Sequence, residues 1–218
     1  MSNELLDFIK ILETENREEA LRFLLKIKVD QNLSVLQIYE DYLTPALNHM
    51  TPTDDQNIDI WKEHVRTSII KTIIENMLPY LKAESKPSRS TPPPVVAVLC
   101  PPEEYHDVGA RMAADILTMA GFQTIFVGGN TPYQAFKAGL SAQPIDYIAI
   151  SISNPYHLVS ARRIIDGIRS SHPQVKIIVG GNAILKHPDI ADVIKADFIA
   201  TTLNDLAHID GGDRHVSI

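Results

Sequence analysis

The first part of the chain shows apolar residues at helical spacing. The segments with this period are residues 4–13, 18–30, 34–50 and 57–81. Ser34 stands at the start of the third segment, where it is a candidate N-cap. Four helices of this size, joined by short polar connections, predict a four-helix bundle over residues 1–83.

The second part of the chain has a different pattern, in which short apolar runs alternate with helical segments. The runs that read as strands are residues 95–100, 123–128, 147–153, 175–181 and 197–202. Near-continuous apolar strands separated by helices indicate a parallel sheet covered on both faces. The predicted fold class is therefore α/β: an N-terminal bundle followed by a flavodoxin-like sheet of five strands, in the order 2-1-3-4-5, over residues 95–210.

Two segments lack any apolar period. Residues 84–94 are rich in Ser, Lys and Pro, which favours a stiff, extended linker between the two domains. This linker would let the bundle move as a unit. Residues 211–218 are polar and Gly-containing, and we expect a loose tail there.

Charge and composition narrow the classes of partner. The net charge of −7 argues against a nucleic-acid surface, so no direct nucleic-acid partner is expected. The single cysteine excludes an intrachain disulfide and suggests a reducing compartment. The N-terminus reads as neither a signal peptide nor a membrane span, so we expect a cytoplasmic protein with no membrane partner.

The loop after the first predicted strand carries a candidate site. Ligands in such sheets bind outside the carboxyl ends of the strands, and His106 stands there, two residues after Glu104. A carboxylate beside an imidazole fixes its tautomer and makes the other ring nitrogen a good metal ligand. Gly109 would let the backbone pass close to a bulky group. The alternative for any lone loop histidine is a solvated surface residue.

Small residues and hydroxyls stand at the ends of the later strands. They are Ser151, Ser153, Gly180, Gly181, Thr201 and Thr202. Each alone is common at a strand end, but together they describe a slot suited to a long polar tail. The GxGxxG fingerprint of dinucleotide-binding folds is missing from the loops after the first two strands.

These motifs resemble those of the cobalamin-binding domain family. That family carries Asp/Glu–x–His–x–x–Gly, then Ser–x–Leu/Thr, then Gly–Gly. The matching residues here are Glu104, His106, Asp107, Val108, Gly109, Ser151, Ser153, Gly180 and Gly181. The resemblance implies a base-off, His-on corrinoid, in which His106 coordinates cobalt from below. The displaced nucleotide tail would enter the slot beside Ser151, Ser153, Gly180, Gly181 and Thr202.

The bundle extends the resemblance. A helical bundle precedes the cobalamin domain in corrinoid methyl carriers, in methionine synthase and in CarH-type adenosylcobalamin photoreceptors. Glu63 and His64 look like the glutamate–histidine pair of those sensors near the adenosyl group, and Trp61 lies close by. Thr53 and Asp54 stand where the sensors have an aromatic residue and a histidine. The alternative is an exposed helical acid and a half-buried histidine.

Three functions stay open from the sequence. The preferred one is a sensory or regulatory cobalamin-binding module, CarH-like but without its own DNA-binding domain, in which adenosylcobalamin is favoured over methylcobalamin. The second is a corrinoid methyl-carrier subunit that serves methyltransferases. The third is a flavodoxin-like module without a corrin. In the preferred interpretation the chain is a binding protein rather than an enzyme by itself, and its further partner is another protein or a second copy.

Overall fold

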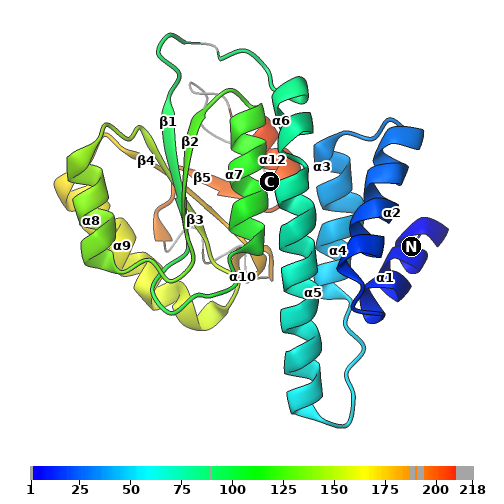
Figure 1. Ribbon diagram of the computed structural model, residues 1–218. Coiled ribbons are helices and arrows are strands. Elements are labelled where there is room, and N and C mark those ends of the chain that lie inside the picture. Colours follow the sequence, from blue (N-terminus) through cyan, green and yellow to red (C-terminus); the bar gives the residue numbers. More distant parts are fainter. Residues whose placement is uncertain (1, 89, 187–189, 191–193, 210–218) are drawn as a thin grey trace. The chain divides into compact units, whose positions relative to one another are not determined.

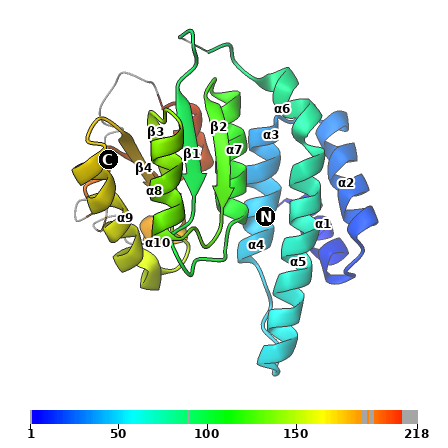
Figure 2. The same ribbon diagram turned by 60° about the vertical axis from the view of Figure 1, so that its left-hand side comes forward.

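The computed structural model describes residues 2–88, 90–186, 190 and 194–209. The predicted loose tail, residues 211–218, lies outside the described residues. The chain divides into two compact units, Met1–Glu84 and Ser85–Ile218. Figures 1 and 2 show the helices of the first unit and the sheet of the second from two directions.

The first unit is helical throughout. Its elements are α1 (Asn3–Glu13), α2 (Arg17–Asp30), α3 (Val35–Ile38), η1 (Tyr39–Leu43), α4 (Thr44–Asn48), α5 (Gln56–Asn76) and α6 (Leu78–Glu84). Ser2, Asn16 and Ser34 cap the starts of α1, α2 and α3 by accepting a backbone hydrogen bond. Large apolar side chains from several of these helices, among them Phe8, Leu24 and Ile70, are fully buried and form the core.

Two of the predicted helices are interrupted. The third is contiguous from α3 through α4, but its middle turn, η1, is π-helical. The fourth, predicted as one helix over residues 57–81, ends as α5 at Asn76, and α6 begins at Leu78. Pro79 explains the second break, because a proline has no N–H to continue the hydrogen-bond pattern of the preceding helix.

A buried ion pair fixes the end of the helical unit. The Lys28 side chain is 6% exposed, and its Nζ lies 2.6 Å from Oε1 of Glu84, the last residue of α6. Nζ also donates to the carbonyl of Leu33, and Oε2 of Glu84 accepts from the backbone N–H of Val35. Because both charges have several partners, breaking the pair would leave a buried charge without compensation.

The second unit is built on the predicted sheet. Its strands are β1 (Val95–Leu99), β2 (Gln123–Gly128), β3 (Tyr147–Ser151), β4 (Lys176–Gly180) and β5 (Phe198–Ala200). They pair in parallel in the order β2-β1-β3-β4-β5, which confirms the predicted fold class. The three central strands are almost wholly buried, as expected for a sheet with helices on both faces.

Helices cover both faces of this sheet (Figures 1 and 2). They are α7 (Val108–Met119), α8 (Tyr133–Ala142), η2 (Pro155–His157), α9 (Leu158–Ser171), α10 (Asn182–Lys186) and α12 (Leu203–Ala207). α7 and α12 contact each other on one face, while α8 and α9 pack on the other. No helix in the described part of the chain is both long enough and apolar enough to cross a membrane.

Candidate functional site

Loops from adjacent strands meet at the carboxyl edge of the sheet, because parallel strands all end on the same side. The loop between β1 and α7 carries Glu104 and His106, and the loop between β3 and η2 carries Ser153 and Asn154. Hydrogen bonds join these two loops although 49 residues separate Glu104 from Ser153. The edge is therefore a defined polar site and not a set of independent turns.

The Glu104 carboxylate is the centre of this site. It is fully buried, and each of its oxygens accepts two hydrogen bonds. Oε1 accepts from Nδ1 of His106 at 2.6 Å and from the His106 backbone N–H at 3.1 Å. Oε2 accepts from the backbone N–H groups of Ser153 and Asn154, at 3.0 and 2.8 Å. One side chain thus holds the imidazole and the neighbouring loop together.

These contacts keep Glu104 ionised. Burial raises the pKa of a carboxyl group, but the hydrogen bonds from Asn154 and His106 and the nearby imidazole outweigh it. The pKa of Glu104 therefore lies below its ordinary value of 4.5. An anionic Glu104 requires a proton on Nδ1 of His106, so in the neutral ring Nε2 carries the lone pair. The His106 side chain is 58% exposed, so Nε2 is positioned to accept a metal ion.

The glycines at the strand ends differ in what they do. A Cβ on Gly181, whose φ is +102°, would lie 2.5 Å from the carbonyl oxygen of Ile152, and one on Gly180 would lie 2.7 Å from that of Ala200. The packing of the sheet therefore already requires these two glycines. A Cβ on Gly109 would meet nothing within 4 Å. Open space beside the His106 loop is what a bulky ligand needs, so the residues here fit a corrin.

The other predicted site residues of the sheet unit have structural contacts of their own. Ser151 is buried and ends β3, while the hydroxyl of Ser153 donates to the carbonyl of His106. Val108, the first residue of α7, is buried in the core, and Asp107 precedes it at the N-cap position. Thr202 caps α12 by accepting from the N–H of Asp205.

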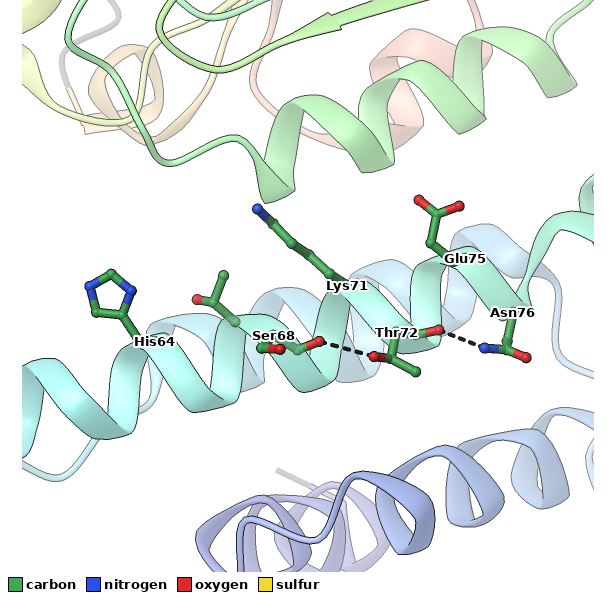
Figure 3. A pocket seen from close by; sticks show the side chains of 7 residues that line it. His64, Ser68, Lys71, Thr72, Glu75 and Asn76 are labelled. Atoms are coloured by element: carbon green, nitrogen blue, oxygen red, sulfur yellow. Dashed lines mark hydrogen bonds between the residues drawn. The ribbon is translucent and has the colours of Figure 1, made fainter.

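The three predicted site residues of the helical unit lie together on α5. Trp61 is 64% exposed and donates from Nε1 to Glu15. His64 lines a hollow along this helix, and Figure 3 shows its imidazole projecting on the same side as Lys71 and Glu75. Within the described residues, neither Glu63 nor His64 has a hydrogen-bond or ion-pair partner for its side chain. The two side chains are adjacent in sequence but do not form a joined pair.

Sequence reasoning missed two asparagines of the site. The N–H of Asn154 binds Glu104, and Asn130, in the loop between β2 and α8, binds the backbone of the His106 loop. Their signals were present in the sequence. Asn130 follows two glycines and Asn154 precedes a proline, and both patterns are typical of tight turns.

Comparison with known proteins identifies the family. The sequence profile described as the B12 binding domain matches residues 94–204, which are 111 of the 218 residues. The chain belongs to the B12-binding domain family. The B12-binding domain covers the whole sheet and every strand-end loop described above, and the chain is accordingly a cobalamin-binding protein. A search of curated proteins gave no match.

Solved structures of similar fold come from corrinoid-binding proteins. The monomethylamine corrinoid protein of Methanosarcina barkeri matches with a TM-score of 0.73 at 14% identity, over 93% of this chain and 94% of that chain. A cobalamin-binding protein from Desulfitobacterium hafniense DCB-2 matches with a TM-score of 0.50 at 14% identity, over 94% and 96%. The methanol:cobalamin methyltransferase complex MtaBC from Methanosarcina barkeri gives 0.48 at 14%, over 95% and 78%. At these identities the likeness is one of fold.

Proposed function

We propose that this protein is a corrinoid methyl-carrier subunit, which holds cobalamin at the carboxyl edge of its sheet and serves partner methyltransferases. The supporting observation is the fold likeness to the monomethylamine corrinoid protein over 93% of this chain and 94% of that one. Both the helical unit and the sheet unit therefore have counterparts in a corrinoid protein. Sequence reasoning ranked this function second, behind a sensory or regulatory cobalamin-binding module.

In this proposal the imidazole of His106 would hold the cobalt of bound cobalamin. Its Nε2 bears the lone pair because Glu104 holds the proton on Nδ1 at 2.6 Å. Bound cobalamin would supply the cobalt centre on which a methyl group is carried between donor and acceptor. The protein's own part is to fix the imidazole, keep Glu104 anionic and leave open space at Gly109.

The remaining predicted site residues divide between the two ends of the ligand. We assign the nucleotide tail to the strand ends at Ser151, Ser153, Gly180, Gly181 and Thr202. The upper face is assigned to Trp61, Glu63 and His64 of α5. We also propose a cytoplasmic location, since a chain with a single cysteine forms no intrachain disulfide.

A cobalamin sensor is the second candidate. The observation that favours it is the exposed His64 on the hollow of α5, beside Glu63, because an imidazole there could act on an upper ligand. Under this alternative the ligand is adenosylcobalamin, and light would change the state of the protein.

Two measurements separate the candidates. Dissociation constants are measured for methylcobalamin and adenosylcobalamin in the dark, and the mass of each complex is then measured by light scattering before and after illumination. A carrier is expected to bind both forms within about tenfold and to keep its mass in light. Selective binding of adenosylcobalamin, with a change of mass on illumination, would contradict the carrier function and favour the sensor.

A further inference from the structure

The loop between β2 and α8 packs directly against the loop that carries His106. A Cβ on Gly129 would lie 3.2 Å from the carbonyl oxygen of Glu104 and 3.3 Å from Cβ of Asp107, which is tighter than an ordinary side-chain contact, so the two loops lie close together here. The backbone N–H of Thr131 donates to the carbonyl of Cys100 at the start of the same loop. The conformation of one loop is therefore tied to that of the other.

Asn130 makes two specific contacts across this junction. Its backbone N–H donates to the carbonyl of Glu104 at 2.7 Å, and its Oδ1 accepts from the backbone N–H of Glu103 at 2.9 Å. Asn130 itself has a φ of 48°, which asparagine tolerates better than other side-chain-bearing residues. Asn130 thus binds the backbone of both Glu103 and Glu104 from a neighbouring loop.

Glu103 is the strained member of the junction. Its φ is 69°, in the left-handed region that a glutamate rarely adopts, and its side chain points to solvent. Since Glu103 directly precedes Glu104, this left-handed turn directs the Glu104 side chain to its buried position beside His106. A strained conformation persists only where surrounding contacts stabilise it, and the hydrogen bond from the Glu103 N–H to Asn130 Oδ1 is such a contact.

We propose that Asn130 is a positioning residue for the lower ligand: by holding Glu103 in the left-handed conformation, its side-chain oxygen sets Glu104 and, through Glu104, the imidazole of His106. This inference rests on the proposed role of His106 as cobalt ligand. Asn130 acts on the backbone alone, so its effect requires an oxygen acceptor at this position and not an amide as such.

The first test changes the acceptor without adding strain. Asn130→Gly removes Oδ1 and still accepts a φ of 48°, whereas Asn130→Asp keeps an oxygen acceptor. Ligation by His106 is read from the electron paramagnetic resonance spectrum of cob(II)alamin bound to protein whose histidines carry 15N, because a histidine ligand then gives doublet splitting whereas the cofactor's own benzimidazole gives triplet splitting. We expect Asn130→Gly to lower the His-on fraction at least about threefold and Asn130→Asp to stay within about twofold of the wild type.

A second readout needs no cofactor. In the ligand-free protein the N–H of Glu103 donates to Asn130 and that of His106 donates to Glu104. We expect amide hydrogen exchange at both positions to be about fivefold faster or more in Asn130→Gly. Exchange at Ile148, in the central strand β3, reports global opening and should not change by the same factor.

A rescue variant tests the strain directly. Glycine adopts a φ of 69° without steric cost, so Glu103→Gly should remove the need for the Asn130 acceptor. In the double variant Glu103→Gly, Asn130→Gly, the His-on fraction is expected to return to within about twofold of the wild type. Should Asn130→Gly alone not fold, a folded double variant without histidine ligation would overturn the proposal, and one with it would support it.

The chain offers a matched control for the asparagine change. Asn32 also has a left-handed backbone, with φ of 50°, and lies in a turn of the helical unit. Asn32→Gly repeats the substitution in that unit and should not alter histidine ligation.

Failure of this inference differs from failure of the proposed function. Wild-type histidine ligation and wild-type exchange at Glu103 and His106 in Asn130→Gly would overturn the role of Asn130. A histidine doublet that survives in His106→Ala would instead remove His106 as the ligand. The exchange measurements on ligand-free protein would then still decide whether Asn130 holds the loop.

Discussion

The molecule contains two glutamate–histidine pairs, and they differ in almost every physical respect. Glu104 is fully buried, accepts four hydrogen bonds and lies 2.6 Å from the imidazole of His106. Glu63 is half-buried and His64 is exposed on α5, and within the described part of the chain their side chains have no such partners. The two pairs share residue types but not an environment.

The difference follows from the backbone around each pair. Inside a helix such as α5, each N–H is already bonded to the carbonyl four residues earlier, so a side-chain carboxylate finds no donors there. Loops at strand ends have N–H groups to offer, and Glu104 takes those of His106, Ser153 and Asn154. A carboxylate–imidazole pair becomes a fixed unit where the fold brings unused backbone donors to it.

Removing each imidazole gives the largest expected contrast. His106→Ala should abolish histidine ligation of bound cob(II)alamin and weaken cobalamin binding by roughly 100-fold, as expected for loss of a metal ligand. His64→Ala should leave ligation intact and change affinity by no more than about fivefold. Spectra and titrations of both variants with the same cobalamin make the measurement. Equal effects of the two substitutions would contradict the claim that only His106 is a cobalt ligand.

Neutralising each acid gives the next contrast. Glu104→Gln places an amide among four donors, so at least one donor loses its acceptor, and we expect unfolding in urea to require about 2–3 kcal/mol less free energy. Glu63→Gln, on the helix surface, should change it by less than about 0.5 kcal/mol. A Glu104→Gln protein as stable as the wild type would mean that the buried carboxylate contributes no net stability.

Acid should weaken the contacts of the buried Glu104 carboxylate. Because the pKa of Glu104 is lower in the folded protein than its ordinary value of 4.5, its contribution to stability is complete above pH 4.5. That contribution is lost as the pH falls from 4.5 through the lower folded value. Between pH 6 and the acid limit of folding, the wild type should therefore lose more unfolding free energy than Glu104→Gln. Parallel pH profiles for the two proteins would contradict the assignment.

The smallest expected effect on stability comes from adding a methyl group at two glycines, one beside the proposed ligand site and one in another helix. Gly109→Ala, in α7, meets nothing within 4 Å and should stabilise the ligand-free protein by up to about 1 kcal/mol. The same change should weaken cobalamin binding, since a methyl group then occupies the open space. Gly139→Ala, in α8, also meets nothing and should stabilise without changing affinity. Calorimetry and titration of both variants test this, and unchanged affinity in Gly109→Ala would place the corrin elsewhere.

Much of the fold could be predicted from hydrophobic periodicity, because buried parallel strands and amphipathic helices have distinct patterns. The alternation of strands and helices predicted a parallel sheet, and the flavodoxin-like order chosen for it is confirmed. Element ends were harder to predict. Pro79 divides the long predicted helix, and β3 stops at Ser151 where its chain turns toward Glu104.

The sequence predicted only those contacts of the site that join residues close together in the chain. The nearness of Glu104 and His106 follows from two positions on one extended loop. The donors from Ser153 and Asn154 lie 49 and 50 residues away, so no local pattern points to them. The role of Gly181 was likewise hidden, because the carbonyl of Ile152 that excludes a side chain there belongs to another strand end.

The chain's single thiol lies within this site. Cys100 is fully buried at the end of β1, with its Sγ 3.9 Å from the carbonyl oxygen of His106. A thiol reagent can reach it only when the loop above it opens. The rate at which a reagent alkylates the native protein therefore measures how often that loop opens. Because the chain has one cysteine, no other thiol contributes to this rate.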